Sequence, residues 1–132
     1  MVCLDTTFVA DLLRRNSDAE KKLNELAKGN DDPCITIITI AELFYGAYKS
    51  KNAEKEKNKI RQVLDDFPIF EMDEHGAEKF GEILTMLEKA GQRISDRDIM
   101  IAAIALSRGE KFIVTRNKKD FQRIPDLTII TY

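Results

Sequence analysis

The chain has 132 residues, of which 43% are hydrophobic and 33% charged, and its 21 Lys and Arg residues against 23 acidic residues give a net charge of −2. This length and composition predict one globular domain over residues 1–132 and exclude a disordered chain. The near-neutral balance excludes a globally basic nucleic-acid-binding protein, so any contact with nucleic acid must come from a local patch. No segment approaches the ~20 apolar residues of a membrane span, and no signal peptide is recognisable, so we expect a cytoplasmic protein without membrane contact.

The pattern of apolar residues predicts short buried strands that alternate with amphipathic helices. In chain order, the expected elements are strand 2–5, helix 6–15, helix 18–28, strand 34–39, helix 40–50, helix 53–67, strand 69–72, helix 74–90, helix 94–108, strand 112–115 and strand 127–132. Strands that are separated by helices predict an α/β fold, in which a central, mostly parallel sheet of about five strands carries helices on both faces.

Polar side chains recur where these strands give way to helices. Asp5 ends the first strand, Glu42 lies three residues beyond the second, and Asn117 and Asp120 follow the fourth. Asp98 begins a helix whose next eight residues are all apolar, and a helix that is apolar on every side is normally buried. Because ligands of open α/β sheets bind beyond the carboxyl ends of the strands, we expect these side chains to meet in one crevice.

Helix capping is an alternative interpretation of the same residues. Thr39 and Ser95 each precede an acid by three residues, as in a capping box, and Asp5 and Asn117 could cap helices as well. Capping does not explain why every acid-bearing junction falls at the same end of the sheet. Clustered carboxylates repel one another unless a cation neutralises them, and Mg²⁺ or Mn²⁺ prefers such oxygen ligands. A site of this kind can polarise a phosphate and activate water.

Four segments, "VCLDTTFV", "ITIAELFYG", "ISDRDIMIAAIAL" and "VTRNKKDFQRIPDL", resemble in order and spacing the PIN-domain ribonucleases, and more narrowly the VapC toxins of type II toxin–antitoxin pairs. The resemblance implies a metal-dependent endoribonuclease that hydrolyses RNA with Mg²⁺ or Mn²⁺. It implies a PIN-like fold, a homodimer and a VapB-like antitoxin that occupies the active-site groove.

The resemblance also implies roles for individual residues. Asp5, Glu42, Asp98 and Asn117 match the catalytic positions, with Asp5 and Asp98 as metal ligands. Asn117 stands where many PIN domains carry Asp, which would weaken a second metal site unless Asp120 compensates. Thr7 and Thr115 match the small hydroxyl positions of the family near the site. Two further acids are expected to support the site, Asp96 as an extra acid two residues before Asp98 and Asp120 as the one that compensates at Asn117, although Asp120 could instead pair with a neighbouring Lys or Arg.

Cationic side chains adjoin the expected site and would suit the backbone of a single-stranded RNA, although a solvated surface explains each of them equally well. They are Arg93, Arg97, Arg116, Lys118 and Lys119. Phe44, Tyr45 and Tyr48 are the available aromatic side chains for stacking, and Phe44 suits the core better. Two rival functions stay open, a silent PIN module that only binds a partner and another Mg²⁺-dependent α/β phosphate-binding domain such as a receiver.

Overall fold

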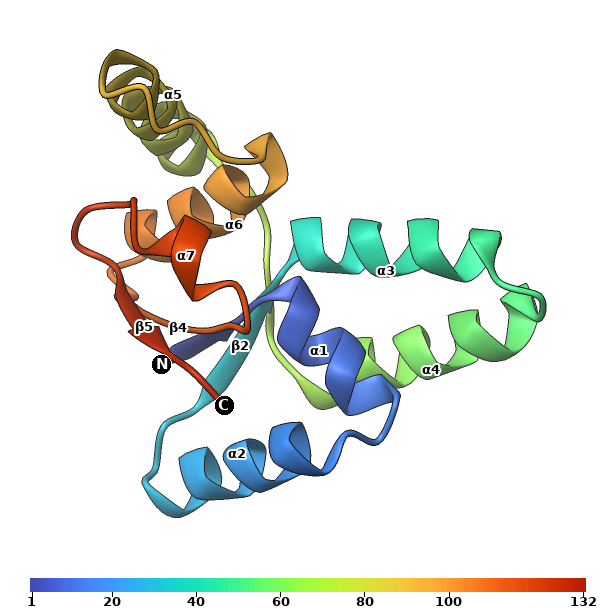
Figure 1. Cartoon of the computed structure of the whole chain (residues 1–132). Coiled ribbons are helices and arrows are strands. Elements are labelled where there is room, and N and C mark those ends of the chain that lie inside the picture. Colours follow the sequence, from blue (N-terminus) through green and yellow to red (C-terminus); the bar gives the residue numbers. More distant parts are fainter.

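The computed structural model describes all residues from Met1 to Tyr132, and it has the expected α/β architecture with an entirely parallel sheet (Figure 1). The strands are β1 Val2–Leu4, β2 Pro33–Thr36, β3 Ile69–Phe70, β4 Phe112–Val114 and β5 Thr128–Ile130. The helices are α1 Thr6–Leu13, α2 Ser17–Lys28, α3 Ile37–Lys49, α4 Ala53–Asp66, α5 Glu74–Lys89, α6 Asp96–Ser107 and α7 Lys118–Phe121.

The strand order β3-β2-β1-β4-β5 determines where a crevice forms. The chain runs from β1 to one side of the sheet through β2 and β3, and then returns to the other side of β1 with β4 and β5. The connections therefore diverge beyond the carboxyl ends of β1 and β4, which is the topological switch point of the sheet. Residues that directly follow these two strands are brought together there, as the 3.1 Å hydrogen bond from the Asp5 N–H to the Val114 carbonyl shows.

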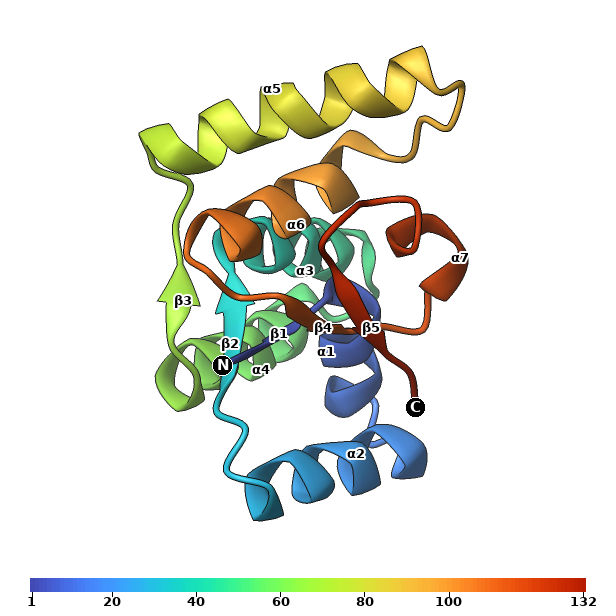
Figure 2. The ribbon, with the colours of Figure 1, turned by 90° about the vertical axis from the view of Figure 1, so that its left-hand side faces the viewer.

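Helices cover both faces of the sheet, because side chains along each strand alternate between two cores. Val2 and Leu4 pack with α1, α2, α3 and α4, whereas Cys3 packs with α5 and α6. Helix α6 lies between the sheet and α5 (Figure 2), and this position explains why it is apolar on all sides. Cys3 and Cys34 are buried free thiols on neighbouring strands.

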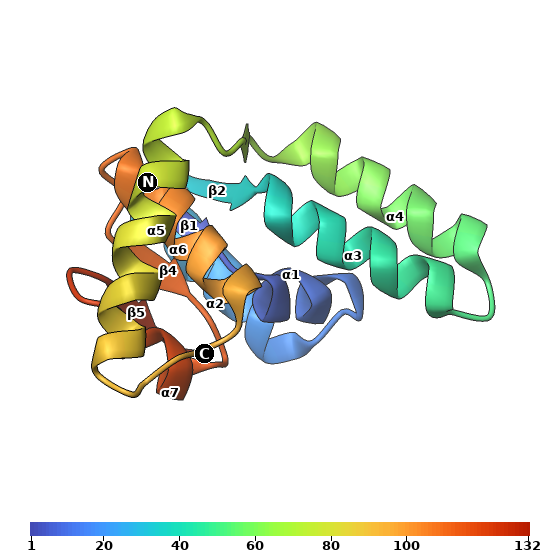
Figure 3. The same cartoon turned by 90° about the horizontal axis from the view of Figure 1, so that it is seen from above.

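Helices α3 and α4 form a hairpin that extends away from the sheet, so that its distal half projects from the rest of the molecule (Figures 1 and 3). None of the seven helices combines the length and the hydropathy that crossing a bilayer requires.

The second strand is shorter than the sequence predicts. We expected a strand over residues 34–39, but β2 ends at Thr36 and the β-branched residues that follow it begin α3. The Thr36 side chain caps this helix by accepting from the Thr39 N–H at 3.4 Å, and burial of Thr39 and Ile40 outweighs their modest helix propensity. Glu42 therefore lies in the second turn of α3, and the expected capping box at Thr39 is wrong. The short helix α7 was not foreseen.

Candidate active site

Asp5 is the most completely bonded of the predicted site residues. Its Oδ1 accepts from the Phe8 N–H at 2.9 Å and from the Thr7 hydroxyl at 2.8 Å, while its Oδ2 accepts from the Thr115 hydroxyl. The residue is 1% exposed, and burial raises the pKa of its carboxyl although these donors oppose the shift. Asp5 thus caps α1, as the capping interpretation predicts, and its carboxylate also lies at the switch point.

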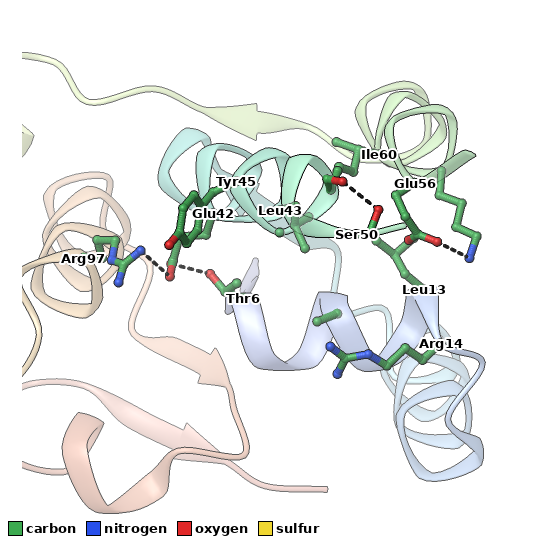
Figure 4. A pocket seen from close by; sticks show the side chains of 14 residues that line it. Thr6, Leu13, Arg14, Glu42, Leu43, Tyr45, Ser50, Glu56, Ile60 and Arg97 are labelled. Atoms are coloured by element: carbon green, nitrogen blue, oxygen red, sulfur yellow. Dashed lines mark hydrogen bonds and ion pairs between the residues drawn. The ribbon is translucent and has the colours of Figure 1, made fainter. Parts of the chain in front are cut away.

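Glu42 reaches the same crevice from α3. The Thr6 hydroxyl donates to Glu42 Oε1 at 2.7 Å and also lies 3.0 Å from the Thr39 hydroxyl, so α1 and α3 are joined beside the site. The other carboxylate oxygen of Glu42 faces Arg97 Nη1 at 3.7 Å (Figure 4). This separation is an ion pair rather than a tight hydrogen bond, so both groups keep freedom to bind other partners.

Asp98 and Asp120 are linked through Asn117. The Asn117 amide Nδ2 lies 3.3 Å from Asp98 Oδ2 and 3.1 Å from Asp120 Oδ2, and it donates to both. Asn117 precedes α7, yet its side chain makes no capping bond. Ser95 likewise precedes α6 without a side-chain cap, so capping accounts for neither Asn117 nor the Ser95–Asp98 pattern.

The charges of this crevice are not balanced by cations within it. The pKa of Asp98 is raised from 3.8 to about 6. Burial is the largest cause, and the neighbouring negative charges of Asp5, Glu42 and Asp120 supply the rest. Arg97 opposes this shift only in part. The crevice therefore carries negative charge that nearby cationic side chains neutralise only in part.

The donors of the site fit a hard divalent cation by chemistry and by charge, since they are carboxylate oxygens. They do not form a finished cage, because no three acidic, histidine or cysteine side chains are close enough together to hold a metal ion. Asp5 and Asp98 are the residues that would hold it, and the loosely bonded Asp98 is the one free to adjust.

Asp120 is one of the four supporting residues and contacts Asn117, as described above. Of the other three, two contact the site directly and one does not. Thr7 and Thr115 donate to Asp5, and Thr115 also accepts from the Asn117 N–H at 2.8 Å. Asp96 instead accepts from Arg93 Nη2 at 3.0 Å on the exposed side of α6.

The predicted cationic rim is only partly available. Arg93 pairs with Asp96 and Glu88, and Arg116 Nη1 lies 3.2 Å from Asp11. Lys118 and Lys119 are exposed on α7 next to Asn117, and Arg97 forms part of the crevice wall.

Sequence reasoning missed Thr6 and Asp11. Asp11 is a buried carboxylate, 3% exposed, that binds the Tyr132 hydroxyl and the Arg116 guanidinium. Burial and the bond to Asp11 raise the pKa of Tyr132. Because the Arg116 N–H also donates to Thr7 at 3.2 Å, Asp11 anchors the loop that delivers Thr115 and Asn117. The available signal was a lone acid within the apolar periodicity of helix 6–15.

A groove of about 610 Å³ leads from the crevice along α1, α3 and α4. Thr6, Glu42, Tyr45 and Arg97 lie at the end of the groove next to the acidic crevice, and Ser50 and Glu56 lie near its far end (Figure 4). Its floor contains apolar side chains of three helices, namely Leu13, Leu43 and Ile60.

Comparison with known proteins places the chain among relatives of nearly the same length. It matches the PIN domain family over residues 2–127. It is 32% identical to Ribonuclease VapC2 of Rickettsia felis over 96% of this chain and 93% of the relative, and 35% identical to the tRNA(fMet)-specific endonuclease VapC of Salmonella typhimurium over 73% and 72%. A crystal structure of VapBC2 from Rickettsia felis bound to a DNA fragment from their promoter superposes with a TM-score of 0.90 at 31% identity, covering 100% of this chain and 99% of that chain.

Proposed function

The chain belongs to the PIN-domain family and is related to the VapC ribonucleases, and from this premise we propose that it is a Mg²⁺- or Mn²⁺-dependent endoribonuclease that acts as the toxin of a toxin–antitoxin pair. The observation that carries the proposal is the crevice in which Asp98 has a pKa raised to about 6 beside Asp5, Glu42 and Asp120. Unneutralised carboxylates at a switch point are what a hydrolase needs to bind a cation and a phosphate together.

In this proposal, four polar residues position the carboxylates of the site. Thr7 and Thr115 hold the Asp5 carboxylate, Thr6 holds Glu42, and Asn117 holds Asp98. A bound Mg²⁺ or Mn²⁺ would supply Lewis-acid stabilisation of the phosphodiester and activation of water. Arg97 at the crevice wall provides a counter-charge for the RNA phosphate.

We also propose a VapB-like antitoxin as the partner and a homodimer as the assembly. Support for the antitoxin comes from the similar VapBC complexes and from the groove, whose apolar floor of Leu13, Leu43 and Ile60 suits the apolar face of a helix. A segment bound there would also block access to Glu42.

The test is cleavage of total cellular RNA by the purified chain with Mg²⁺, with Mn²⁺ and with a chelator, alongside thermal unfolding under the same conditions. We expect cleavage only with metal, and a thermal midpoint that rises with metal because the ion binds only the native state. Asp98→Asn should remove both effects. If metal binds but RNA stays intact, the chain is a silent PIN module. If metal neither binds nor changes cleavage, the metal assignment is wrong.

A further inference from the structure

The distal half of the α3–α4 hairpin has a charge opposite to that of the whole chain. Residues 45–61 contain six cationic and only two acidic side chains, whereas the chain has a net charge of −2. The cations are Lys49, Lys51, Lys55, Lys57, Lys59 and Arg61. A local positive field of this kind attracts a polyanion without requiring a basic protein.

The same segment carries the two most exposed aromatic side chains of the molecule. Tyr45 is 59% exposed and Tyr48 is 68% exposed. The Lys49 ammonium lies 4.8 Å from the ring centroid of Tyr45, and the Lys57 ammonium lies 4.9 Å from that of Tyr48. Each tyrosine thus combines a π surface with a cation, and nucleotides offer the complementary pair of a base and a phosphate.

These tyrosines continue directly from the candidate active site. Glu42, Tyr45 and Tyr48 follow one another at three-residue intervals on α3, so they lie on neighbouring turns, with Tyr48 ~9 Å along the helix axis from Glu42. Glu42, Tyr45 and Arg97 line one groove (Figure 4), which Lys59 also lines in an ion pair with Glu56 at 3.2 Å. A strand whose phosphate reached the acidic crevice would therefore pass over Tyr45.

We propose that this part of the hairpin, residues 45–61, is an RNA-binding arm of the protein. It binds single-stranded RNA next to the scissile phosphate by stacking bases on Tyr45 and Tyr48 and by pairing a phosphate with Lys49. This inference rests on the proposed ribonuclease function. The charge of the arm favours RNA over a protein segment as the molecule that binds there. The arm has a surplus of cations, which an RNA backbone would neutralise, whereas an apolar helix would need only the apolar floor of the groove.

The experiment measures RNA binding separately from cleavage. Asp98→Asn serves as the parent so that RNA stays intact, and the probe is a fluorescein-labelled unstructured RNA of about 12 nucleotides, within the range that single-strand-binding sites cover. Anisotropy gives the Kd as a function of KCl concentration. In this parent we compare Tyr45→Ala with Tyr48→Ala, the conservative pair Tyr45→Phe with Tyr48→Phe, and Lys49→Gln. The matched control is Lys21→Gln with Lys28→Gln on α2, which removes exposed charge away from the arm.

We expect the alanine pair to weaken binding at least ~10-fold, because two bases lose the aromatic faces on which they stack. The phenylalanine pair should bind like the parent, since the π faces remain. Lys49→Gln should reduce the slope of log Kd against log [KCl] by ~0.7, the value for one phosphate contact on a single strand. The α2 control should change neither quantity.

The opposing outcomes are equally specific. Parent-like binding by the alanine pair overturns the arm, and so does an equal loss in the α2 control. If the alanine pair weakens capture of an antitoxin peptide but not of RNA, the surface is a protein contact and the proposal is wrong. If the native chain cleaves RNA while the alanine pair in the Asp98→Asn parent binds RNA as tightly as that parent does, the arm fails but the ribonuclease function stands. Absence of both RNA binding by the parent and cleavage by the native chain overturns both.

Discussion

The two halves of the acidic crevice are constructed differently. The half at β1 and β4 is closed, since Asp5 is buried and three donors fix its carboxylate. The half at α3 and α6 is open, since Asp98 is half-buried and its hydrogen bond to Asn117 is 3.3 Å long, while Glu42 faces Arg97 across 3.7 Å. The fold therefore fixes the Asp5 carboxylate with three donors, whereas Asp98 is held only by a long hydrogen bond and lies beside other negative charges.

The largest expected effects are those of removing Asp5 or Asp98, and the stability of the two variants should distinguish the closed half from the open half. Asp5→Ala and Asp98→Ala should each reduce metal-dependent RNA cleavage at least ~100-fold, because both remove a carboxylate that would hold the cation. Asp5→Ala should also destabilise the metal-free protein by ~2 kcal/mol, since it removes a helix cap and leaves the buried Thr115 hydroxyl without its acceptor. Asp98→Ala should leave metal-free stability unchanged or raise it. Urea unfolding in the presence of a chelator distinguishes the two, and equal destabilisation by both would contradict the comparison.

The pH dependence of stability should come from the open half. Because the folded pKa of Asp98 is about 6, the folded state holds a proton there that the unfolded state releases near 3.8. Stability supplied by this group is therefore present below pH ~4 and is lost as the pH rises through 6. A shift of this size would amount to ~3 kcal/mol for a fully buried group, and solvent screening of this half-buried carboxylate reduces it to on the order of 1 kcal/mol.

The measurement is the difference in unfolding free energy between Asp98→Asn and the native chain, taken without metal from pH 4 to pH 8. The variant should gain relative stability as the pH rises and reach a plateau above pH ~7. Subtraction cancels the contributions of the other titrating groups, such as Asp73, whose pKa is lowered by its bond to the Gly76 N–H. A difference that does not change with pH would show that neither burial nor the neighbouring carboxylates raise the pKa of Asp98 in the folded protein.

Much of this arrangement could be predicted from the sequence, for identifiable physical reasons. The apolar stretch after Asp98 indicated a buried helix with a carboxylate at its tip, and strand–helix alternation predicted the parallel sheet that brings Asp5 beside Thr115. Hydrophobic periodicity did not locate the end of β2, because β-branched residues such as Ile37 favour a strand locally and enter a helix only through tertiary burial.

The contacts of Thr6 and Asp11 were not predictable in the same way. Thr6 bonds Glu42 across 36 residues, and Asp11 bonds Tyr132 across 121 residues. A pattern with a period of two or 3.6 residues contains no information about which distant side chains meet. Helix α7 has four residues, too few for any helical period to become visible.

Asn117 offers an intermediate effect that sharpens the comparison. Asn117→Asp replaces an amide that donates to Asp98 and Asp120 with another carboxylate. We therefore expect lower metal-free stability and tighter metal binding. Half-maximal cleavage should occur at a several-fold lower Mn²⁺ concentration. Asp120→Asn is the matched variant and should shift the titration modestly the other way. If only Asp120→Asn moves the titration, Asp120 is the fourth acid. If neither does, three carboxylates are sufficient.

Asp96 should show the smallest effect, although it lies only two residues from Asp98. Its side chain is bound to Arg93 on the exposed side of α6 and has no bond to the crevice. Asp96→Asn preserves the shape of the side chain and weakens only a solvent-exposed ion pair, which typically contributes under ~1 kcal/mol. We therefore expect the rate of cleavage to lie within about threefold of native and the metal titration to be unchanged. Asp98→Asn, which should lose both cleavage and metal binding, is measured alongside for comparison. A loss from Asp96→Asn comparable to that from Asp98→Asn would mean that Asp96 turns inward when RNA or metal binds. The open half of the crevice would then extend to Asp96, the first residue of α6, instead of ending at Asp98 as the hydrogen bonds of this structure indicate.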